Sequence, residues 1–108
     1  MTIGYDTPWR QVHALLQLAA SRTEGIRTDP KPTVMQVALE DFYVNYRLFV
    51  VVDQPERRLR ILAALHANIQ DAFNEYGVQI MSPHYESDPG GQKVVQLDRW
   101  YSAPAAAP

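Results

Sequence analysis

Three histidines are the side chains best suited to acid–base chemistry or metal binding in this chain of 108 residues: His13, His66 and His84. His13 and His66 each lie in a segment with helical spacing of apolar residues. Neither has a second histidine or a carboxylate three or four residues away, which a two-ligand metal face on a helix needs. We therefore expect both to have structural roles.

His84 follows an apolar run and a Ser-Pro turn in "GVQIMSPHY", residues 77–85, so it lies where a strand ends and a catalytic residue could stand. However, the chain has no Gly-x-Ser-x-Gly elbow, and Ser82 is only two residues away along the same chain. A small hydrolase using His84 is the weaker hypothesis. It predicts that His84→Ala abolishes an activity without loss of folding.

Other reactive groups are absent or explained by local structure. There are no cysteines, so thiolate metal sites and cysteine nucleophiles are excluded. Glu40-Asp41 suits a hairpin tip and Asp53 with Glu56 suits a helix cap. Gly90-Gly91 lacks the spacing of a phosphate-binding loop. We predict no catalytic, metal or cofactor-binding residues, and no enzyme.

Charge and hydropathy limit the partners. The net charge of −2 and the scattered basic residues provide no stripe that follows a phosphate backbone, so no nucleic acid partner is expected. The small cluster Arg57, Arg58 and Arg60 is interpreted as a solvated face, with a contact to a neighbouring subunit or an anion as the alternative. The longest apolar run, "LFVVV" at 48–52, is far below the roughly 18 residues that cross a bilayer.

Spacing of apolar residues predicts six elements. A short strand at "TIGY" precedes a helix capped by Thr7 with Pro8 at its first position and ending near Gly25. Residues 33–39 and 42–52 form a hairpin, with the apolar even positions of the second strand on one face. A helix follows from the "DQPE" capping box to Gly77, and residues 78–81 form the last core strand.

This order favours an α+β fold, a ferredoxin-like βαββαβ sandwich whose mostly antiparallel sheet carries both helices on one face. Residues 1–85 are the expected domain. Residues 86–108 are expected to be a flexible connector, a short strand at 93–97 and a tail. The abrupt opening strand is natural for a piece of a longer protein.

Four stretches together resemble one family: "IGYDTPWRQV" at 3–12, "DFYVNYRLFVVVDQPE" at 41–56, "LHANIQDAFNEYGVQI" at 65–80 and "MSPHY" at 81–85. They are similar to the C-terminal cytoplasmic domain of small-conductance mechanosensitive channels of the MscS type. The resemblance implies a domain at the base of a homoheptameric vestibule on the cytoplasmic side of the inner membrane. The domain would be soluble, with the membrane helices upstream, and would help to form the portals that ions and small solutes pass on osmotic downshock.

The family often ends in a short strand that joins its symmetry mates, and the resemblance places this strand at 93–97. A strand separated from the core by a flexible connector has few partners in its own domain, and an exposed edge pairs with another chain. We therefore expect subunit contacts at His84, Tyr85, Val94, Val95 and Leu97. The alternative function is a ligand-sensing oligomerisation module of the same fold, which an upstream enzyme or DNA-binding domain would favour.

Overall fold

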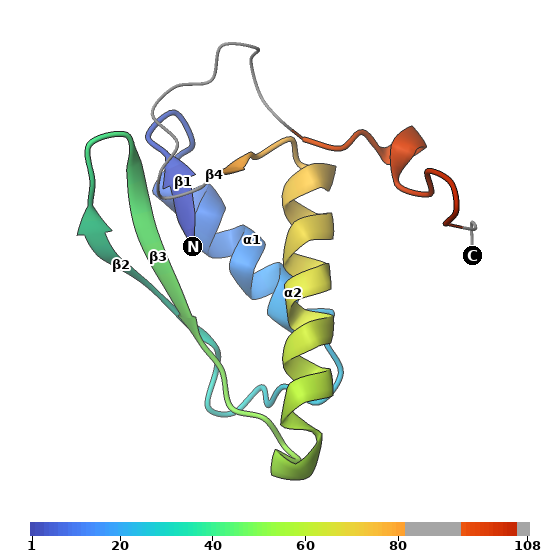
Figure 1. Cartoon of the computed structure of the whole chain (residues 1–108). Helices are drawn as coiled ribbons and strands as arrows, with labels where there is room; N and C mark the ends of the chain where they lie inside the picture. Colours follow the sequence, from blue (N-terminus) through green and yellow to red (C-terminus); the bar gives the residue numbers. More distant parts are fainter. Residues whose placement is uncertain (82–93, 106–108) are drawn as a thin grey trace.

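The computed structural model describes residues 1–81 and 94–105. Its regular elements follow the predicted order of strand, helix, hairpin, helix and strand (Figure 1). In chain order they are β1 (Thr2–Gly4), α1 (Trp9–Ser21), β2 (Thr33–Leu39), β3 (Tyr43–Phe49), the 3-10 helix η1 (Pro55–Arg57), α2 (Arg58–Glu75), β4 (Ile80–Met81) and the 3-10 helix η2 (Leu97–Arg99). No helix in these described ranges is long and apolar enough to span a membrane.

The four strands form one sheet in the order β2-β3-β1-β4, with every neighbouring pair antiparallel. Both helices lie on the same side of this sheet (Figure 1). The register of β2 on β3 shifts between Gln36 and Ala38, so Val37 is an extra residue in the edge strand. The α+β class predicted from the sequence is confirmed.

The core lies between the sheet and the two helices. Its most completely buried large side chains come from β1, α1, β3 and α2: Tyr46, Phe73, Ile3, Leu16 and Val12. The alternation predicted for the second hairpin strand is confirmed at Val44 and Tyr46, which are buried. Phe42 precedes that strand and is 50% exposed, so its assignment to the buried face was wrong.

Helix α1 differs from its prediction at both ends. The Thr7 side chain makes no cap hydrogen bond; Pro8 stands at the N-cap, and its carbonyl accepts from the N–H groups of Gln11 and Val12. The helix ends at Ser21, well before Gly25. Just beyond this end the Thr23 hydroxyl donates to the Ala19 carbonyl at 2.8 Å, a side-chain bond of the kind that competes with helical backbone bonding.

Gly25 instead forms a turn with a φ of 95° that brings the loop after α1 against the chain leaving β3. The Gly25 carbonyl accepts from the Asp53 N–H at 2.9 Å, and Ile26 forms an isolated antiparallel bridge with Val52. The strand expected to reach Val52 therefore ends at Phe49. Beyond it, the chain pairs with this loop.

The predicted capping box at the second helix was also wrong. Neither η1 nor α2 has a side-chain cap, and Gln54 and Arg57 stand at the two N-cap positions. The C-terminus of α2 is as predicted at Gly77, whose φ is 70°. The Val78 N–H donates to the Phe73 carbonyl at 2.8 Å and the Gly77 N–H to the Asn74 carbonyl at 3.2 Å, which together form a Schellman motif.

Residues 94–96 have no regular structure and η2 follows them, so in the single chain the described part of the 93–97 segment is not a strand. The Val95 N–H donates to the Asn74 side-chain oxygen of α2 at 3.1 Å. The Trp100 indole N–H donates to the Val95 carbonyl at 3.1 Å and closes this segment on itself. The predicted domain boundary at 85/86 lies outside the described residues.

Candidate functional site

His13 is a partly buried residue of α1 that lies between two aromatic side chains. Its ring meets Trp9 edge-on at 5.1 Å between centroids and Tyr46 at 5.9 Å, so aromatic side chains flank it. The His13 Nε2 atom is buried and has no hydrogen-bond partner among residues 1–81 and 94–105. Both ring contacts are with aromatic side chains, and the structural role expected for His13 stays a prediction.

The other sequence-level candidates are separated from one another. His66 is exposed on α2, and Arg57, Arg58 and Arg60 are exposed at the start of that helix. Across the described parts of the chain, no group of three histidine, aspartate or glutamate residues could hold a metal ion. His84 lies outside the described residues. Among the described residues, therefore, the predicted reactive side chains are not brought together.

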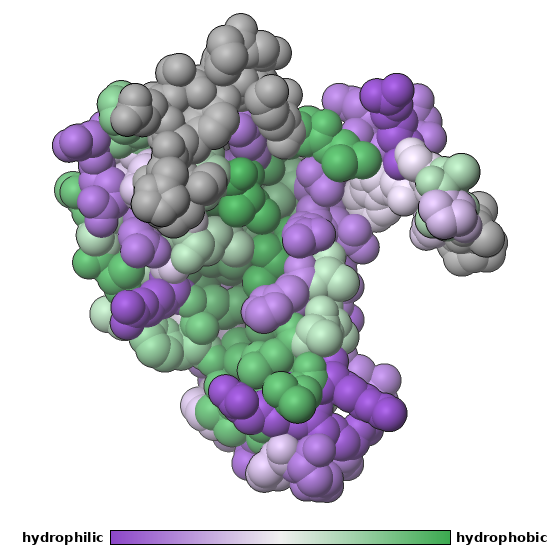
Figure 2. Space-filling model, in the orientation of Figure 1, coloured by the Kyte–Doolittle hydropathy of each residue, from purple (hydrophilic) through white to green (hydrophobic). Residues whose placement is uncertain are grey.

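A groove with many apolar lining residues lies between β3 and α2. Its volume is about 320 Å³. Figure 2 shows it as a hydrophobic band between the sheet and α2. It is lined by Met1 of the chain start, by Leu16 of α1, and by residues of β3 with its exit and of α2: Tyr46, Arg47, Leu48, Phe49, Val50, Leu62, Leu65, His66 and Ile69.

The groove exists because the elements around it have unequal lengths. Helix α2 has 18 residues, whereas β1, the strand beside β3 in the sheet, has three. At about 1.5 Å per helical residue and about 3.4 Å per strand residue, α2 is roughly 27 Å long and β1 roughly 10 Å. Among the residues that the structure describes, no strand beyond Met1 lies between β3 and the first half of α2.

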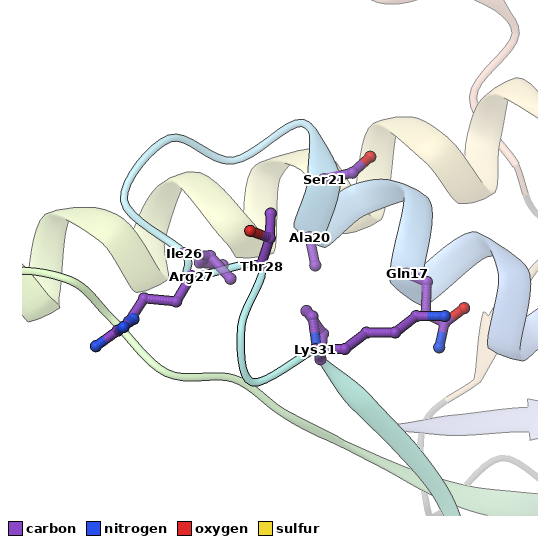
Figure 3. Close-up of a pocket in the computed structure, with 8 residues that line it drawn as sticks. Gln17, Ala20, Ser21, Ile26, Arg27, Thr28 and Lys31 are labelled. Carbon is purple, nitrogen blue, oxygen red and sulfur yellow. The ribbon is translucent and has the colours of Figure 1, made fainter.

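A second depression, of about 310 Å³, lies between the end of α1 and the loop that leads to β2 (Figure 3). Lys31 extends across it toward Gln17, whereas the Arg27 guanidinium points away from it. Ala20, Ile26 and Pro32 give it an apolar floor. With one cation and no convergent set of polar groups, it offers no catalytic chemistry.

Comparison with known proteins decides the family. The family model described as the C-terminal part of the mechanosensitive ion channel MscS matches residues 1–80. The chain belongs to this family. Among curated proteins, no significant match to the chain was found.

The matched range of this MscS C-terminal domain includes both helices and nearly all of the sheet. It confirms the resemblance drawn from the four sequence stretches. The domain is thus a module of an ion channel, and surfaces that contact other polypeptides are the features to examine for function.

Three of the five predicted subunit contacts of the MscS domain lie in the described residues. Val95 is 46% exposed and Leu97 is 68% exposed, whereas Val94 is partly buried. His84 and Tyr85 lie outside the described residues. The exposed pair is free to contact another chain, and its role in assembly stays a prediction.

The outer face of the sheet was missed by the sequence analysis. Met35 of β2 and Phe49 of β3 are each about half exposed on the face away from the helices. The signal was present, because Phe49 and Val51 are apolar at odd positions of a run whose even positions were assigned to the core. Apolar residues at both odd and even positions are therefore a sequence signal that an apolar side chain can lie on either face of this strand.

Proposed function

We propose that this chain is a wall unit of the cytoplasmic vestibule of a mechanosensitive channel. The family match over residues 1–80 carries the proposal. In the complete protein the domain lies on the cytoplasmic side of the inner membrane, seven copies form a cage, and openings between copies are the portals for ions and small solutes. The domain supports assembly and gating stability without sensing tension itself.

The strand order supports a ferredoxin-like assignment. In a split βαβ arrangement each helix crosses over a neighbouring strand, which gives the order β2-β3-β1-β4 with antiparallel neighbours and both helices on one face. Such a sheet leaves its opposite face free for other polypeptides. Met35 and Phe49 on that face make it suitable for contacts within an oligomer.

The C-terminal segment is the second part of the proposed assembly surface. Val95 and Leu97 expose apolar side chains that the single chain does not cover. In the oligomer, residues 93–97 exchange the contact with Asn74 for strand pairing with symmetry mates, because identical edges in a ring supply the missing hydrogen bonds. His84, Tyr85 and Val94 complete the proposed subunit contacts.

The proposed role is tested by osmotic downshock. The complete gene is expressed in a host that lacks its own mechanosensitive channels, and survival is counted after transfer to dilute medium. We expect survival well above that of cells carrying the empty vector. A protein that is inserted at normal levels and gives no rescue would contradict the proposal.

The assembly role of the C-terminus has a separate test. Removal of residues 86–108 should leave the domain folded, since the core cluster of the described residues runs from Ile3 to Val78, and should weaken the oligomer of the complete channel. Crosslinking of solubilised channels measures the oligomer, and circular dichroism of the isolated domain measures folding. Unchanged subunit association after truncation would count against the role.

A further inference from the structure

The groove between β3 and α2 has a polar wall as well as apolar ones. The α-amino nitrogen of Met1 donates to the Tyr46 carbonyl at 3.0 Å, and the Tyr46 N–H donates to the Met1 carbonyl at 2.7 Å. Met1 and Tyr46 are therefore a hydrogen-bonded antiparallel pair, one position beyond the pairing of Thr2 with Asn45. In such a ladder the next backbone groups on this edge of β3 belong to Leu48 and then Val50.

Within residues 1–81 and 94–105, no strand pairs with this edge of β3 beyond Met1, and apolar side chains face it from the helices. Leu62 and Leu65 of α2 and Leu16 of α1 line the groove opposite β3. A small apolar ligand would cover these side chains but would leave the N–H and C=O groups of the strand edge without partners. An extended peptide supplies both kinds of contact at once.

We propose that the residues immediately N-terminal to position 1 in the complete channel continue β1 along β3 and close this groove. The inference rests on the proposed function, which makes this domain the C-terminal part of a longer chain. Continuity supports this occupant: Met1 is already paired with β3, and Met1 and residues 46–50 of β3 and its exit line the same groove. A separate peptide would have to displace or abut that chain end.

The register makes the proposal specific. Side chains alternate along a strand, and Ile3 faces the core, so Met1 and the second and fourth residues before it face the helices. The second preceding residue lies opposite Leu48 and the fourth opposite Val50, both against α2. The first lies opposite Arg47, on the outer face. The second preceding residue should therefore be apolar.

Burial of the chain end agrees with this arrangement. The pKa of the Met1 α-amino group is lowered, first by burial and then by the charge of Arg47. A peptide bond at this point would remove the charge and keep the hydrogen bond to Tyr46. In the complete chain no charged amine would then have to be buried beside the apolar groove, and the free-energy cost of burying it would be avoided.

Pairing is tested by disulfide formation in the complete channel, whose domain contributes no native cysteine. One variant carries a cysteine at the first preceding position together with Arg47→Cys, the directly opposite residue in the proposed register. The matched control replaces Phe49 instead, on the same face of β3 but two residues, roughly 7 Å, further along. We expect the first pair to crosslink within one subunit at least tenfold faster than the control.

A second experiment measures amide exchange in the isolated domain. The chain is extended by its six natural preceding residues or by six glycine and serine residues, and amide exchange is followed by NMR. The natural extension should slow exchange at Leu48 and Val50 at least tenfold relative to the chain that begins at Met1, and the glycine-serine extension should not. Equal crosslinking in both cysteine variants, or no added protection, would overturn the proposal. Neither readout requires channel activity, so failure here is distinct from failure of the proposed function.

Discussion

The two glycines with positive φ should respond very differently to the same substitution by alanine. Gly77 has a φ of 70°, and a Cβ atom there would meet no atom within 4 Å. Gly25 has a φ of 95°, and its Cβ would lie 2.7 Å from Cδ1 and 2.8 Å from Cγ1 of Ile61. Ile61 is buried and 4% exposed, so it cannot swing into solvent.

At Gly77 the only cost of an alanine is that of its left-handed backbone conformation. A left-handed conformation costs a residue with a Cβ about 1–2 kcal/mol, partly offset by the lower entropy of the unfolded chain, so we expect Gly77→Ala to lower the free energy of unfolding by about 1 kcal/mol. At Gly25 overpacking adds roughly 1–3 kcal/mol to the same backbone cost. Gly25→Ala should therefore cost roughly 3 kcal/mol.

Urea unfolding followed by circular dichroism measures both values, and thermal unfolding should show midpoints lowered by about 5 °C and roughly 15 °C. The steric part is isolated by Ile61→Val, which removes the nearest atom. Alone it should cost about 1 kcal/mol, but beside Gly25→Ala it should cost less or stabilise. Equal losses at the two glycines, or strictly additive effects of the Gly25 and Ile61 changes, would refute this reasoning.

Further predictions concern the surface and the chain end. The lowered pKa of the Met1 amine means that the unfolded chain binds more protons, so the stability of the domain should rise with pH between that pKa and about 8, and Nα-acetylation should abolish the rise. Asn74→Ala should speed amide exchange at Val95 while changing the free energy of unfolding by about 0.5 kcal/mol or less, since it removes an exposed contact; unchanged exchange would contradict the contact. Arg22 and Glu75 form an exposed ion pair at 2.9 Å, so Glu75→Gln should destabilise less than Gly77→Ala, and 1 M salt should remove the difference from the parent chain.

The sequence predicted what depends on periodicity. Alternation identified Val44 and Tyr46 as core residues. Gly77 was identified as the end of α2 because a glycine that follows an apolar helical stripe usually ends the helix. These features are set by residues close in the chain. The α+β class followed from their order.

The sequence could not predict features that depend on competition between distant groups. Thr7 and Asp53 had the chemistry of N-caps, but neither caps a helix, and the Asp53 N–H bonds to Gly25, which is 28 positions earlier. The groove arises from the difference in length between β1 and α2, and it is visible only once β1 is placed beside β3. For the site, the sequence therefore indicated only local motifs, and it did not predict the groove.

Patch recording of the complete protein tests the central claim most directly. Membranes of a channel-deficient host expressing the full gene should show a conductance that opens with applied suction, and removal of residues 1–108 should reduce the number of assembled, active channels. Patches that contain the correctly inserted protein and stay silent up to the tension that ruptures the membrane would contradict the assignment of this domain to a working mechanosensitive channel.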